Sequence, residues 1–123
     1  MKPRHHEHPE CRAISETLQL VGDKWTVLVV SQLGQRTMRF NELRHSIENI
    51  SQKMLTTTLR QLERDGFVTR TVFPVIPPRV DYALTDLGRD LLGPVQGLIQ
   101  WARDNSERME RARQSYEVRV AAE

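Results

Sequence analysis

The sequence of 123 residues lacks several features that define whole classes of proteins. It has a single cysteine, Cys11, so no disulfide can form within the chain and a reducing compartment is expected. Its longest apolar run, Val27 to Val30, is far shorter than the about 20 residues that a membrane-spanning helix needs. No apolar segment typical of a secretory signal follows the N-terminal charges. We therefore expect a cytoplasmic protein with no membrane partner.

The patterns on which enzymes depend are also missing. No paired carboxylates and no nucleophile with a matching base stand at a spacing typical of an active site. The six glycines are scattered one by one and form no phosphate-binding loop. We predict a protein that is not an enzyme and that uses no cofactor.

What the sequence does have is an uneven distribution of charge. The net charge of the chain is only +2, and its length fits one domain. Residues 36–80, however, contain eight Lys or Arg against four Asp or Glu, a net of +4, which leaves −2 for the rest. A basic middle between acidic ends indicates a polyanionic partner.

The first part of the chain is predicted to form three helices and a short strand. Asp23 and Asn41 are expected to act as N-caps, and Gly22 and Gly34 to end helices. The predicted elements are helices over residues 12–21, 24–33 and 41–46 and a strand over residues 37–40.

The segment between Ser51 and Gly66 predicts a helix with two contrasting faces. Ser51 is the expected N-cap and Gly66 the left-handed stop. Leu55, Leu59 and Leu62 fall within an arc of about 60° and predict the buried side. The opposite side carries amide, hydroxyl and cationic groups, on Gln52, Lys53, Thr56, Thr57 and Arg60.

Two strands and a long helical region complete the chain. Residues 67–73 and 80–84 predict strands, and the PVIPPR segment between them predicts an exposed hairpin tip with Arg79 at its base. Thr85 and Asp86 are expected to open a helix. Because proline disrupts a helix interior, Gly93-Pro94 predicts either two helices, over 86–92 and 94–117, or one kinked rod.

The order of these elements predicts an α+β fold, a winged helix-turn-helix, in which the helix after Ser51 enters the major groove of DNA. Several segments in this order also resemble the HxlR-type winged helix-turn-helix transcriptional regulators. The matching segments, with x for a position outside the match, are GDKWT at 22–26, MRFNELRHSI at 38–47, ISxKMLT at 50–56, LRQLERDGFVTR at 59–70, PPxVxYxLTxLG at 77–88, and Trp101.

The resemblance implies a sequence-specific DNA-binding homodimer that reads a two-fold operator and whose terminal helices form the dimer contact. A flexible N-terminal tail is expected over residues 1–10 and a single domain over 11–123. Within that domain, 11–35 and 86–118 are expected to supply core and dimerisation helices, and 36–85 the DNA-binding helix-turn-helix and wing. The alternative is a winged-helix module that binds protein or RNA and no operator.

Nine residues are predicted to contact double-stranded DNA. The outward side of the helix after Ser51 is assigned to the major groove, where Gln can read adenine and Arg guanine. Ser51 caps that helix and touches phosphate, while residues before it and at the wing contact the backbone. The predicted set is Arg39, Asn41, Ser51, Gln52, Lys53, Thr56, Thr57, Arg60 and Arg79.

The segment HHEHPEC, from His5 to Cys11, raises two further questions. Its histidines lack the spacing of two separated ligand pairs that zinc sites use, so no metal site is predicted. By resemblance to the family, Cys11 is a candidate redox sensor, and a small molecule or an electrophile is the candidate effector. A helix N-terminus and Arg12 would favour the thiolate, whereas Glu10 opposes it and Arg12 replaces the family's usual proline.

Overall fold

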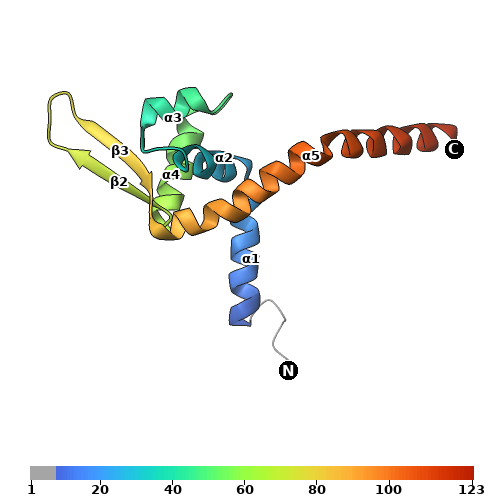
Figure 1. Cartoon of the computed structure of the whole chain (residues 1–123), viewed down its shortest axis with the longest axis horizontal. Coiled ribbons are helices and arrows are strands. Elements are labelled where there is room, and N and C mark those ends of the chain that lie inside the picture. The colour runs from blue at the N-terminus through green and yellow to red at the C-terminus, as the bar shows by residue number, and fades with distance from the viewer. Residues whose placement is uncertain (1–7) are drawn as a thin grey trace.

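The structure, a computed structural model, describes residues 8–123. It contains five helices and three short strands in that part of the chain, in the predicted winged helix-turn-helix arrangement (Figure 1). The elements are α1 Pro9–Val21, α2 Lys24–Leu33, β1 Met38–Arg39, α3 Phe40–Ser46, α4 Gln52–Arg64, β2 Val68–Phe73, β3 Arg79–Leu84 and α5 Asp86–Ala122.

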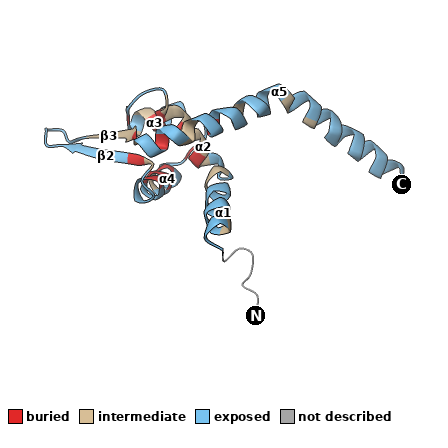
Figure 2. Ribbon diagram, turned by 60° about the horizontal axis from the view of Figure 1, so that its bottom comes forward, coloured by how far each residue is buried: buried red, intermediate tan, exposed pale blue. Residues whose placement is uncertain are grey.

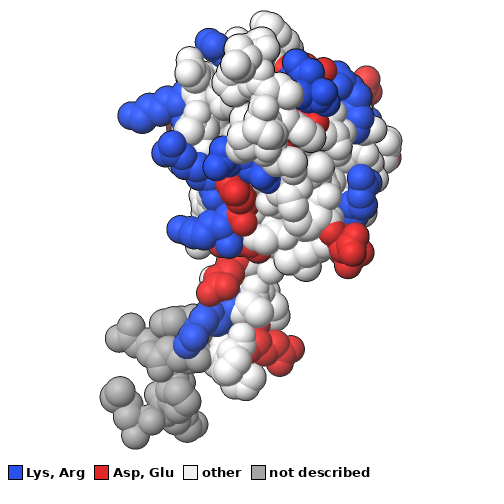
Figure 3. All heavy atoms as spheres, turned by 90° about the vertical axis from the view of Figure 1, so that its left-hand side faces the viewer, with Lys and Arg blue, Asp and Glu red and all other residues white. Residues whose placement is uncertain are grey.

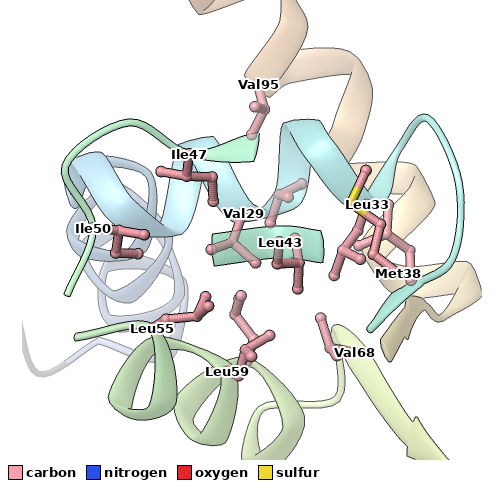
Figure 4. Close-up of a cluster of buried hydrophobic side chains, with 13 residues drawn as sticks. Val29, Leu33, Met38, Leu43, Ile47, Ile50, Leu55, Leu59, Val68 and Val95 are labelled. Atoms are coloured by element: carbon pink, nitrogen blue, oxygen red, sulfur yellow. The ribbon is translucent and has the colours of Figure 1, made fainter. Parts of the chain in front are cut away.

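The hydrophobic core lies between α2, α3, α4 and the inner end of the sheet. Figure 4 shows the side chains of these elements pointing toward one another, with Val95 of α5 closing one side. The core is entirely aliphatic apart from Met38. Its members are Val29, Val30, Leu33, Met38, Leu43, Ile47, Ile50, Leu55, Leu59, Leu62, Val68, Leu84 and Val95.

Helix α4 begins and ends where the sequence predicts. The Ser51 hydroxyl accepts a hydrogen bond from the Met54 N–H at 3.0 Å and so satisfies one donor of the first turn. At the other end Gly66 adopts a φ of +86°, which reverses the chain into β2. Leu55, Leu59 and Leu62 are buried, as predicted, so the opposite side of α4 faces solvent.

The three strands form an antiparallel sheet in the order β1-β3-β2. Strands β2 and β3 pair from Val68 opposite Leu84 to Phe73 opposite Arg79. The loop Pro74–Pro78 is therefore the tip of a hairpin, as predicted, and the hairpin projects from the body in Figure 1. We call β2, β3 and this loop the wing, and Pro74–Pro78 the wing tip.

Helix α5 is one continuous helix, so of the two predicted alternatives the single rod is right and the two separate helices are wrong. Its first turn is capped by Thr85, whose hydroxyl accepts from the Gly88 N–H at 3.1 Å. Pro94 lies inside the helix on an exposed side, where water can satisfy the carbonyl that loses its partner. Gly93 has no positive φ and does not end the helix. Beyond the residues that pack on α2 and β3, α5 runs away from the body as an exposed rod (Figure 2).

Two predicted helix starts are displaced. Helix α1 begins at Pro9 rather than Arg12, because the His8 imidazole accepts from the Glu10 N–H at 3.2 Å and Pro9 suits a first helical position. Of the tail predicted over residues 1–10, Pro9 and Glu10 belong to α1, and residues 1–7 lie outside the described residues.

Helix α3 begins at Phe40, and Asn41 is not its cap. The residue at the cap position is Arg39, whose N–H donates to the Glu42 carboxylate at 3.0 Å. This bond places the cap two residues earlier than the predicted Asn41.

The burial of α4 gives a first prediction. Leu59→Ala is expected to lower the free energy of unfolding by about 2–5 kcal/mol, because the side chain is 2% exposed and its loss leaves a cavity. Its neighbour Arg60 is exposed and forms no ion pair within residues 8–123, so Arg60→Ala is the matched control and should change stability by less than about 0.5 kcal/mol. Chemical denaturation measures both. Equal losses would contradict the orientation of α4.

Candidate nucleic-acid interface

The exposed side of α4 is the centre of the candidate interface. Because the leucines point inward, Gln52, Lys53, Thr57 and Arg60 are exposed and Thr56 is half-buried. Ser51 stands at the N-terminal end as the cap. The surface therefore presents hydrogen-bonding groups and cations on one regular helix, a form that fits the major groove.

A hollow of about 280 Å³ joins α4 to the wing. It is lined on the helix side by Thr56 and Arg60 and on the sheet side by Arg70 and Tyr82. Arg70 Nε lies 3.8 Å from a carboxylate oxygen of Glu63, so the pair links the last turns of α4 to β2. Burial raises the pKa of Tyr82, and its phenol stays protonated at neutral pH. The exposed side of α4 and the base of the wing thus form one continuous surface.

A second hollow, of about 770 Å³, lies between the start of α3 and the part of β3 next to the wing tip. Arg39 and Asn41 line one side and Arg79 lines the other. The three residues that the sequence assigned to the DNA backbone, although separated by as many as 40 positions, are therefore brought around one hollow.

Ion pairs divide the cations of this surface into two groups. Arg36 Nη1 donates to Glu42 at 2.8 Å, and Arg79 donates through Nε and Nη2 to the two oxygens of Asp81, both at 3.0 Å. The Arg79 guanidinium also lies over the Phe73 ring, 5.1 Å from its centroid. Hydrogen bonding to Asp81 raises the pKa of Arg79, and Arg79 in turn lowers the pKa of Asp81.

Three cations of the surface have no ion pair within residues 8–123. They are Arg39, Lys53 and Arg60, one before α3 and two on α4. Figure 3, in which the wing faces the viewer, shows Lys and Arg side chains on both sides of a broad uncharged area. The unpaired cations are the charges most available to phosphate, whereas Arg79 is already held by a carboxylate.

Two residues of this surface are absent from the predicted set. Arg70 and Tyr82 stand beside Arg60 only because the strand register places them opposite each other. The sequence shows that Arg70 belongs to the basic middle of the chain, but it does not show the register in which β2 pairs with β3.

Cys11 lies in the first turn of α1, three residues after the cap His8, and is half-buried. The metal question concerns His5, His6, His8 and Cys11, of which His5 and His6 lie outside the described residues. Among residues 8–123, no three His, Cys, Asp or Glu side chains gather as a metal site would require. None of the helices in this part of the chain has the length and apolar character of a membrane span.

The contacts of Glu42 give a prediction with a defined pH dependence. The Arg39 N–H and then the Arg36 guanidinium hold the pKa of Glu42 below its ordinary value. A lowered pKa in the folded state stabilises the fold above the unfolded pKa of about 4.3, and this stabilisation is lost as pH falls through the folded pKa. Glu42→Gln should therefore lower the Tm at pH 7, and its difference from wild type should shrink below about pH 4.

The control for this comparison is Glu48→Gln, since Glu48 is exposed and makes no side-chain hydrogen bond or ion pair within residues 8–123. Scanning calorimetry from pH 7 to about pH 3 measures the Tm of both variants. A Glu42→Gln deficit that is the same at every pH would show that the charge of Glu42 is not what stabilises α3.

Comparisons with known proteins agree with this geometry. The family model described as HxlR-like helix-turn-helix matches residues 20–110. An HTH-type transcriptional regulator of Escherichia coli K12, YtfH, is 43% identical over 86 residues, covering 70% of this chain and 68% of YtfH.

Solved structures extend the likeness to the fold. The putative transcriptional regulator ytfH from Salmonella typhimurium superposes with a TM-score of 0.78 at 35% identity, over 93% of this chain and 99% of that one. The redox regulator HypR in its reduced form superposes with a TM-score of 0.76 at 37% identity, over 80% of this chain and 98% of that one. The predicted fold and the predicted class of DNA-binding transcriptional regulator are confirmed, and the chain belongs to the HxlR-like helix-turn-helix family.

Proposed function

We propose that the protein regulates transcription as a homodimer, placing one α4 helix of each subunit in successive major grooves of a two-fold operator. The observation that carries the proposal is the contrast between the two sides of α4. One side is locked into the core by leucines, and the other presents Lys53 and Arg60 without an ion pair within residues 8–123. Because the genome that such a regulator reads is cytoplasmic in bacteria, the proposal places the protein there.

Each residue on α4 has a role that follows from its chemistry. Gln52 and Arg60 can make two hydrogen bonds to one base edge, Gln to adenine and Arg to guanine. Lys53 neutralises phosphate. The short side chains of Thr56 and Thr57 let the helix approach the bases closely, and Ser51 offers its hydroxyl to phosphate at the helix N-terminus.

The hollow between α3 and β3 supplies the flanking contacts. Arg39 neutralises a phosphate there and Asn41 donates to the same strand. Arg79 uses two of its five donors on Asp81, so the remaining N–H groups can reach a phosphate oxygen. Its charge is already compensated, and it should contribute less to the salt dependence than Arg39.

The terminal helices carry the proposed dimer contact. Helix α1 buries no residue, and α5 is exposed at every residue from 110 to its end (Figure 2). Large apolar side chains on both helices stay in water in the single chain: Ile14 and Leu18 on α1 are 52% and 62% exposed, and Leu98 and Trp101 on α5 are 50% and 57% exposed. A second copy that covers them would remove this surface from water. A small-molecule effector could bind in the same interface.

The strongest test of the groove assignment uses Arg60. A duplex is first selected from a random library by the wild-type protein, and its affinity is then measured by fluorescence anisotropy. Arg60→Ala is expected to weaken binding about tenfold or more, because a bidentate contact to guanine is lost. Arg89→Ala, an exposed position at the start of α5, is the matched control and should bind like wild type.

Two outcomes would contradict the proposal. Unchanged affinity of Arg60→Ala would remove this residue from the groove. A wild-type protein that selects no duplex, and whose affinity for random duplex does not fall steeply with salt, would favour a module that binds protein or RNA instead.

Control by oxidants is a second part of the proposal, supported by the place of Cys11 in the first turn of α1 and by the relative named as a redox regulator. Diamide would oxidise the Cys11 thiols of two subunits to one disulfide and itself be reduced. Operator affinity of the wild type should then change with diamide, and that of Cys11→Ser should not. An identical response of both proteins would exclude Cys11 as the sensor.

A further inference from the structure

The wing tip and the end of β2 before it carry no charge. From Thr71 to Pro78 there is no Asp, Glu, Lys or Arg. The nearest cations along the chain are Arg70 and Arg79, and each lies against a carboxylate, of Glu63 and Asp81 respectively. The tip itself must therefore contact DNA without neutralising phosphate.

The same segment is strongly apolar and open to solvent. Ile76 at the apex is 101% exposed, and Val75 beside it is 52% exposed. An exposed isoleucine at the end of a projection contributes no buried apolar area to the stability of the fold. Its burial in a complex would be favourable. It is the kind of side chain that enters the minor groove as a wedge in other DNA-binding proteins.

The wing tip is also stiff. Pro74, Pro77 and Pro78 restrict the backbone, and the Val75 N–H donates to the Phe73 carbonyl at 2.8 Å. At the base, Arg79 covers the Phe73 ring and pairs with Asp81 on the same strand. Because the tip has little conformational freedom, its immobilisation in a complex costs little conformational entropy. This favours binding.

We propose that Ile76 is an apolar wedge that enters the minor groove next to the half-site held by α4. This inference rests on the proposed DNA binding. The minor groove is about 6 Å wide, so it excludes the two-stranded hairpin but admits a single side chain at its apex.

The surroundings of the wing favour DNA as the occupant. One hollow joins the strands of the wing to Arg60, and the other joins them to Arg39. The tip therefore projects from the cationic surface that faces phosphate. The tip is a narrow projection in Figure 1, and in Figure 3 the uncharged area lies between groups of Lys and Arg. A flat protein partner would need a broad apolar surface, which a five-residue tip does not supply.

An uncharged wedge has a particular thermodynamic signature. Its removal should weaken binding by the same factor at every salt concentration, because no counterion is released on its account. Removal of a phosphate-binding lysine should instead reduce the slope of log affinity against log salt by about 1. The wedge should also favour deformable pyrimidine–purine steps beneath the wing, since these unstack at low cost.

The experiment compares Ile76→Ser, Ile76→Leu, Lys53→Ala and Arg89→Ala in the full chain, on the duplex selected by the wild type, at four or more salt concentrations. Arg89→Ala is the matched control, because Arg89 is exposed at the start of α5 and lines neither hollow. Ile76→Ser should lose about tenfold in affinity with an unchanged salt slope. Ile76→Leu should keep most of the affinity, Arg89→Ala all of it, and Lys53→Ala should show the reduced slope.

The outcomes separate the wedge from the function on which it rests. Ile76→Ser binding within twofold of the wild type at every salt concentration would overturn the wedge, including the case in which the tip binds a protein. A changed salt slope for Ile76→Ser would overturn it as well. If Lys53→Ala reduces the slope of log affinity against log salt while Ile76→Ser binds like the wild type, only the wedge is contradicted. If the affinity of the wild type for the duplex does not depend on salt, the proposed DNA binding itself is contradicted.

Discussion

The packing of Leu55, Leu59 and Leu62 against α2 and α3 is the constraint on which the rest of the structure depends. It fixes the rotation of α4, and through that rotation it decides which side chains face outward. A helix turned by one residue would carry Arg60 into the core at a large desolvation cost. The apolar stripe therefore specifies the candidate interface as much as the polar residues do.

Charge pairing adds a second level of organisation. Arg36, Arg70 and Arg79 are each held by a carboxylate: Arg36 joins the segment before β1 to α3, Arg70 joins β2 to the end of α4, and Arg79 pairs within β3. Such exposed pairs contribute little stability individually, but they orient the segments around the two hollows. The remaining cations stay available to an external polyanion, and the wing tip is left without charge.

Much of this arrangement could be predicted from the sequence, because it depends on local signals. Ser51 and Gly66 define α4, Asp23 and Gly34 define α2, and the prolines define the wing tip. The Arg79–Asp81 pair could also have been predicted, since residues two apart on a strand share a face.

The errors have physical causes that lie outside local pattern. The start of α1 depends on a histidine acting as cap, the start of α3 on a glutamate that reaches back to Arg39, and the continuity of α5 on solvent access at Pro94. The closeness of Arg60, Arg70 and Tyr82 depends on strand register and on the docking of α4 against β2. These are tertiary relations that no single window of sequence contains.

The central claim is that two α4 helices read one duplex from adjacent major grooves. The most direct measurement is methylation interference at guanine N7 on the selected duplex. The account predicts two clusters of interference on one face of the DNA, related by a two-fold axis and separated by about one helical turn, roughly 34 Å. A single cluster without symmetry, or no interference at guanine N7 on a duplex that the protein still binds, would contradict it.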